Sequence, residues 1–95
     1  MSELVYYKLV SGEELVAKQV SVGDTATVID DAVTLVYHQT DKGVSVGFAP
    51  FMPQGEGKAT LYHSGIAAVG VPNDQVRSEH TRIFSGIVLA SAGSI

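Results

Sequence analysis

The sequence contains neither cysteine nor tryptophan, and only three prolines occur among its 95 residues. Without cysteine, the chain can form no disulfide and can offer no thiolate to a metal ion. No run of about 18 apolar residues occurs, which excludes a membrane-spanning helix, and no secretory signal precedes the first strand-like stretch. We therefore expect a protein of the cytoplasm, or of a host cell's cytoplasm, that acts without a membrane.

Positive charge is also scarce. Six Lys and Arg stand against ten Asp and Glu, which gives a net charge of −4. Residues 1–40 contain two lysines and six carboxylates, whereas residues 41–95 contain four cations and four carboxylates. Because Lys and Arg supply most of the affinity for phosphates, non-specific binding to nucleic acid should be weak and sensitive to salt. This balance still permits a local nucleic-acid site.

Motifs of catalysis and of metal binding are missing as well. The sequence has no phosphate-binding loop, no nucleophile elbow and no HExxH motif. Its three histidines lack the spacing of metal ligands, and Asp30 and Asp31 have no further carboxylates clustered with them. Ser64 follows His63, but adjacency in sequence does not create the geometry of a catalytic triad. We predict a protein that is not an enzyme, with no catalytic residue, metal or cofactor.

What the sequence does contain is a series of short β-type stretches in one domain, residues 1–95. Alternating and β-branched residues predict strands at residues 5–10, 15–22, 25–29, 33–39, 44–49, 59–62 and 66–71. In the second strand, Val16, Lys18, Val20 and Val22 are expected on one face. Asp30-Asp31 is expected to interrupt the chain after the third strand, and residues 41–43 form a tight hairpin turn.

The hydrophobic period changes near the end of the chain. Asn73 can cap a helix, and Val76, His80, Ile83 and Phe84 then lie on one helical face. Gly86 suits the helix exit, and residues 87–90 are expected to form a last strand or to pack on the core. Together these elements predict a mainly β fold: a small antiparallel barrel, open or half-open, with one short helix in its C-terminal half.

The segment FAPFMPQGEGK, residues 48–58, is unusual because Phe51 and Met52 stand between two prolines. Proline lacks the N–H that a central strand needs, so this segment is expected to leave the sheet. Its large apolar side chains would then face a second copy of the chain, a nucleobase stacked on Phe51, or the core of their own domain. The first of these is the prediction that we favour.

Two stretches resemble the signatures of Sm and Sm-like proteins. In LVSGEELVAKQV, Gly12 and Ala17 stand where that family has its two small residues, and LYHSGI resembles the second signature, with Tyr62-His63 in place of Arg-Gly. The stretches SGEELVA, APFMP and HTRIFSGIV are similar to the branch of this family that bacteriophages, cyanophages in particular, carry. The resemblance implies a strongly bent five-stranded antiparallel barrel and a cyclic homo-oligomer of about five to seven subunits.

The resemblance also implies a function, namely binding of single-stranded nucleic acid, RNA more than DNA, in RNA or DNA processing or in phage regulation. Candidate contacts are the aromatic ring and polar groups of Tyr62, His63 and Ser64, the carboxylates of Asp30 and Asp31, and the cation of Lys58. The plainer interpretation is that these residues form ordinary turns, in which Asp side chains bond their own backbone, and a solvated loop.

Ring formation needs an interface between subunits. In the related fold, neighbouring subunits pair strands at their edges, so we predict an interface made of Phe51, Met52, Ala59, Thr60, Leu61, Ile66 and Ala68. Phe51 and Met52 would be its anchors. The alternative function is a structural or adaptor ring that binds no nucleic acid.

Overall fold

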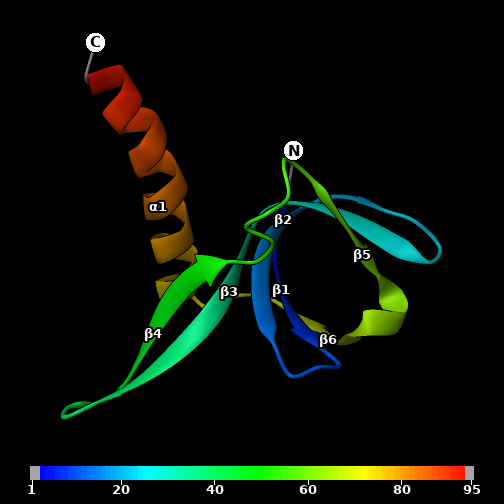
Figure 1. Ribbon diagram of the computed structural model, residues 1–95, viewed down its shortest axis with the longest axis horizontal. Coiled ribbons are helices and arrows are strands. Elements are labelled where there is room, and N and C mark those ends of the chain that lie inside the picture. Colours follow the sequence, from blue (N-terminus) through cyan, green and yellow to red (C-terminus); the bar gives the residue numbers. More distant parts are fainter. Residues whose placement is uncertain (1–2, 94–95) are drawn as a thin grey trace.

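The computed structural model describes residues 3–93, with side-chain environments to Phe84. Six strands are followed by one helix (Figure 1). The elements are β1 (Glu3–Leu9), β2 (Glu14–Val22), β3 (Ala26–Thr40), β4 (Gly43–Pro50), β5 (Ala59–Tyr62), the 3-10 helix η1 (His63–Gly65), β6 (Ile66–Gly70) and α1 (Asp74–Gly93).

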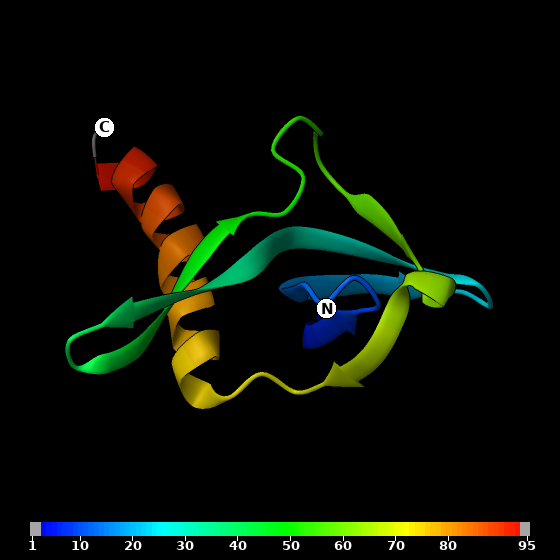
Figure 2. The ribbon, with the colours of Figure 1, turned by 60° about the horizontal axis from the view of Figure 1, so that its bottom comes forward.

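All strand pairs are antiparallel, and the sheet has the order β4-β3-β2-β1-β6, with β5 beside the first half of β3. β4 and β6 are therefore the outer strands of this order, and each of them, like β5, pairs with one strand alone among the described residues. Figures 1 and 2 show a strongly bent sheet, in which η1 joins β5 and β6 at the end of the molecule opposite α1. This bent, open, antiparallel sheet with one helix confirms the mainly β prediction.

A bulge in β3 contributes to the bend. Val33 lies opposite Val16 and Asp30 lies opposite Lys18, so two residues of β3 stand against Ala17 alone. Asp31, one of these two, has a φ of 51°, a conformation that fits a local kink. The prediction that Asp30-Asp31 ends the strand was wrong, because β3 continues through the bulge and pairs again with β2.

The bulge also changes which face of the sheet β3 covers. Before it, Ile29 packs in a first core with Tyr7 and Leu15. After it, Val33 and Leu35 pack in a second core on the other face. Side chains alternate strictly along a regular strand, so one additional residue is enough to move the later half to the opposite face.

β2 contributes to both cores. Leu15, Val16 and Ala17 are all buried, Leu15 and Ala17 in the first core and Val16 in the second. Of the residues predicted to share one face of β2, Val16 is buried, whereas Val20 and Val22 are exposed. Two covered faces at the start of β2 remove the alternation that a half-buried strand would show.

The helix begins as predicted and ends later than predicted. The Asn73 side chain accepts a hydrogen bond from the Val76 N–H at 2.9 Å, and Val76 and Phe84 pack on the second core. The helix runs through Gly86 to Gly93, so the short helix and the strand at residues 87–90 were wrong. Glycine permits a helix exit without forcing one. Figure 2 shows α1 beside the β3–β4 end of the sheet and extending past it.

His80 connects α1 to the bulge through a hydrogen bond. Its ring is 2% exposed, its Nε2–H donates to the Asp31 carbonyl at 2.8 Å, and its ring centroid lies 4.5 Å from that of Phe84. The bulge leaves a carbonyl free of the ladder, and the helix supplies the missing donor. Among the described helices, none is long and apolar enough to cross a membrane.

Candidate nucleic-acid interface

The predicted nucleic-acid residues lie at two separate places. In the β3–β5 pair, Ile29 stands opposite Ala59 and Ala26 stands opposite Tyr62. Lys58 therefore lies near the bulge, at one end of β5, whereas Tyr62 and the residues after it lie at the other end. The three intervening steps of strand separate these ends by about 10 Å. A single site made of all six residues is not what the fold provides.

At the far end of β5, two connections meet: residues 23–25 between β2 and β3, and residues 62–65 around η1. We call them the loop pair. The His63 N–H donates to the Thr25 carbonyl at 2.9 Å, and His63 Nε2 lies 2.9 Å from the Thr27 hydroxyl. Both connections lie at the same end of the molecule in Figures 1 and 2. Backbone and side-chain bonds thus hold the loop pair together.

The loop pair presents an aromatic ring and several polar groups. Tyr62 is 63% exposed, Ser64 is exposed and His63 is half-buried. The sequence reasoning missed Asp24, whose exposed carboxylate stands in the turn facing η1. The one available signal was the Gly23-Asp24 turn directly before a strand, and it needed the β3–β5 register to become meaningful. The loop pair contains no Lys or Arg.

At the bulge, the two carboxylates have partners of their own. Asp30 Oδ1 accepts the Asp31 backbone N–H at 3.0 Å, and the Lys18 ammonium lies 3.2 Å from Asp31 Oδ2. These contacts support the kinked backbone, which is the turn chemistry expected of Asp. Their contact with a base edge stays a prediction.

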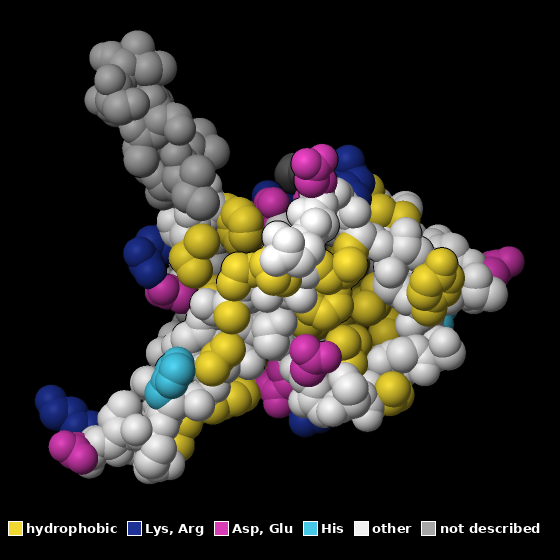
Figure 3. Space-filling model, viewed as in Figure 1, with side chains coloured by type: hydrophobic (Ala, Val, Ile, Leu, Met, Phe, Trp, Pro, Cys, Tyr) yellow, Lys and Arg dark blue, Asp and Glu magenta, His cyan; other side chains and the backbone are white. Residues whose placement is uncertain are grey.

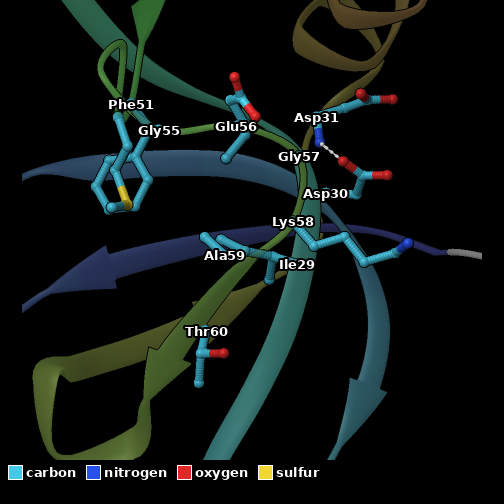
Figure 4. Close-up of a pocket in the computed structure, with 12 residues that line it drawn as sticks. Ile29, Asp30, Asp31, Phe51, Gly55, Glu56, Gly57, Lys58, Ala59 and Thr60 are labelled. Atoms are coloured by element: carbon cyan, nitrogen blue, oxygen red, sulfur yellow. Dashed lines mark hydrogen bonds between the residues drawn. The ribbon is translucent and has the colours of Figure 1, made fainter.

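A pocket of about 310 Å³ lies between the bulge and the segment from Phe51 to Thr60. Figure 4 shows the Phe51 ring at one side of this pocket, with Ile29 and Ala59 between it and the bulge. The side chains of Asp30, Asp31 and Lys58 point away from that ring. A base stacked on Phe51 would therefore not reach these charged groups with its edge.

The predicted interface residues divide into buried and accessible ones. Leu61 is part of the first core, and Phe51, Ala59 and Ile66 pack half-buried against that core. Met52, Thr60 and Ala68 are exposed. Phe51 thus packs within its own domain, whereas the Met52 side chain is left exposed. β5 itself pairs with β3 along its whole length.

The outer strands carry the exposed apolar side chains that the sequence reasoning did not single out. Val44 and Val46 on β4 are 61% and 42% exposed, and Val69 at the end of β6 and Val71 just after it are 62% and 78% exposed. Figure 3 shows apolar side chains spread over the molecule from β4 to the hollow between β1 and β5. Exposed, unpaired edges of this kind attract further strands.

A hydrogen-bonded cluster lies between these two edges. The hydroxyls of Tyr6 and Tyr37 both donate to Glu14 Oε1, and Lys8 Nζ lies 3.4 Å from Oε2. The hydrogen bond from Tyr37, and next that from Tyr6, lowers the pKa of Glu14, while the bond to Glu14 raises the pKa of Tyr6. The cluster borders an apolar groove of about 280 Å³ that Val46 and Val71 flank.

In the described part of the chain, no group of three or more His, Asp or Glu side chains is arranged to hold a metal ion. No model of a known protein family matches this sequence, and no curated protein matches it significantly. The arguments for function therefore rest on the residues and their geometry.

Proposed function

We propose that this chain is the subunit of a cyclic homo-oligomer that binds single-stranded nucleic acid, RNA more than DNA, through its loop pair. The observation that carries the proposal is the free outer edge of β4 and of β6, with exposed valines on or just beyond each strand. The resemblance to Sm-like proteins supports about five to seven subunits and a role in RNA or DNA processing or phage regulation.

Assembly follows from the two edges being different. When β4 of one subunit pairs with β6 of the next, the contact is head-to-tail, and such contacts generate rings if the rotation closes. Pairing would satisfy the backbone groups of both edges and would bury Val44 and Val46 against Val69 and Val71. Burying one such side chain contributes about 1.5–3 kcal/mol. Met52 is accessible to join this interface.

Binding follows from repetition of the loop pair around the ring. The exposed Tyr62 ring can stack on a base, which contributes about 1–3 kcal/mol, and His63, Ser64 and Asp24 can contact base edges. A single site of this strength is weak, and several sites on one ring gain affinity through effective concentration. This avidity offsets the shortage of Lys and Arg.

Assembly is tested by light scattering and native mass spectrometry of the wild type and of two edge variants, Val46→Lys and Val69→Lys. A lysine on an edge strand opposes strand addition, so both variants should shift the mass toward the monomer. Val10→Lys is the matched control, because Val10 is at least as exposed as the two edge valines and lies outside the strands. A wild type that is monomeric at every concentration would overturn the proposal.

Binding is tested by fluorescence anisotropy with short single-stranded RNA and DNA, from low to physiological salt. The Tyr62→Ala/His63→Ala variant should lose binding while keeping the wild-type mass. Gln54→Ala, in an exposed turn outside the loop pair, should bind as the wild type does.

A structural or adaptor ring is the second candidate. The observation that favours it is the loop pair itself, which has one carboxylate and no Lys or Arg. A ring that binds no oligonucleotide even at low salt would support this candidate and would refute nucleic-acid binding.

A further inference from the structure

A buried hydroxyl, that of Thr27, lies against the His63 ring of the loop pair. Thr27 is 3% exposed, and its Oγ1 lies 2.9 Å from His63 Nε2. Thr27 sits on β3, opposite Leu61 of β5, so two paired strands define the position of this hydroxyl. The His63 backbone is held independently, by its N–H bond to the Thr25 carbonyl.

The direction of the Thr27–His63 hydrogen bond follows from which groups are otherwise satisfied. Among the described residues, His63 Nε2 is the partner found for the Thr27 hydroxyl. If Nε2–H were the donor, the Thr27 O–H would remain a buried donor without an acceptor, which costs about 1–3 kcal/mol. If the hydroxyl donates to Nε2, both groups are satisfied, and the imidazole proton lies on Nδ1.

His63 Nδ1 has no partner in the described part of the chain, and no buried side-chain nitrogen or oxygen there lacks a partner. Nδ1 is therefore accessible to solvent, beside the exposed ring of Tyr62. An N–H at this position is a donor that solvent or a ligand can reach. Its natural partner is a hydrogen-bond acceptor, and on single-stranded nucleic acid this is a base carbonyl oxygen or a phosphate oxygen.

We infer that Thr27 is a positioning residue that holds His63 in the Nδ1–H tautomer, so that the loop pair offers an accessible N–H donor to an acceptor oxygen of its ligand. The tautomer follows from the geometry of the protein alone, whereas the identity of the acceptor rests on the proposed nucleic-acid binding.

The tautomer is read directly by two-bond ¹⁵N–¹H correlation spectra of the imidazole ring at a pH where His63 is neutral. The wild type should show a protonated Nδ1 and an unprotonated Nε2. Thr27→Val keeps the shape and β-branching of the buried side chain without its hydroxyl, and should shift His63 to the Nε2–H form. Thr27→Ser keeps a hydroxyl and should restore the wild-type pattern. A wild type in the Nε2–H form, or a Val variant with an unchanged spectrum, overturns the inference.

Oligonucleotide binding then tests the consequence for the ligand. Thr27→Val should weaken binding about 2- to 12-fold, the equivalent of one hydrogen bond, and Thr27→Ser should recover it. If Thr27→Val weakens binding of an abasic single strand by the same factor, the N–H donor contacts phosphate. If it weakens binding only of strands that carry bases, the donor contacts a base carbonyl. Equal binding of wild type and Thr27→Val on both strands refutes the ligand contact. If the wild type does not bind, the proposed function is refuted. The tautomer of His63 is then still decided by the ¹⁵N–¹H spectra.

Discussion

Removal of the His80 side chain should measure how strongly α1 is fastened to the bent sheet. His80→Ala removes the hydrogen bond to the Asp31 carbonyl at 2.8 Å and the contact with the Phe84 ring. A hydrogen bond of this kind contributes about 0.5–1.5 kcal/mol, and a ring contact contributes a further 0.5–1.5 kcal/mol or so. We therefore expect a loss of about 1–3 kcal/mol in the free energy of unfolding.

The assay is urea unfolding followed by circular dichroism, at one fixed protein concentration because assembly would add to the apparent stability. A loss near 2 kcal/mol corresponds to a decrease of about 8–16 °C in the melting temperature of a domain of this size. His80→Phe keeps an aromatic ring and loses the hydrogen bond, so it should fall between the wild type and the alanine variant.

Glu79→Ala is the neighbouring control, because the partly exposed Glu79 lies on the same turn of α1 and pairs with Arg82. Surface substitutions away from special features stay within about 0.5 kcal/mol. If His80→Ala destabilises the protein no more than Glu79→Ala does, His80 does not hold α1 on the bulge, and the proposed role of this contact is refuted.

Three further predictions concern the core, the bulge and the hydrogen-bonded cluster around Glu14. Leu15→Ala removes a fully buried side chain and should cost about 2–5 kcal/mol in urea unfolding; a cost below 1 kcal/mol would contradict the assigned core. Asp31 has a φ of 51°, so Asp31→Val should destabilise the protein by about 1–2 kcal/mol more than Asp31→Gly does, and equal melting temperatures would argue against the bulge. The pKa of Glu14 is lowered from about 4.5, mainly by the hydrogen bond from the Tyr37 hydroxyl. The ionised Glu14 therefore contributes its full stabilisation above the pKa that it has in the unfolded chain. That stabilisation is lost as the pH falls through the lower pKa of the folded protein. Urea titrations between pH 7 and pH 3 should therefore show a smaller acid loss for Glu14→Gln than for the wild type, and identical pH profiles would refute this.

Much of the fold could be predicted from local sequence patterns. The strands around the hairpin turn at residues 41–43, the cap at Asn73 and the helical face of Val76, His80 and Phe84 were predicted and are present. Each of these depends on residues close together in the chain, where turn chemistry and hydrophobic period act directly. The burial of His80 on the apolar helix face could be predicted for the same reason.

The candidate site could be predicted less well from the sequence. Asp30 and Asp31 were grouped with Tyr62 and His63, although the β3–β5 register keeps them at opposite ends of β5. Asp24 was overlooked, although its turn meets η1. Both errors have one origin: which turns lie side by side depends on strand register, and the β3–β5 register is set between residues 30 to 36 positions apart.

The sequence by itself determined the elements: short β-branched strands, one capped amphipathic helix, an acidic surface and no thiol chemistry. Only the tertiary structure decided where these elements act. The bulge at Asp31 moves the later half of β3 to the other face of the sheet, so that one strand serves two cores, and it frees the carbonyl that His80 binds. A bulge is a mismatch between two strands, one residue against two. It exists only when both strands are paired, and no pattern in either strand alone specifies it.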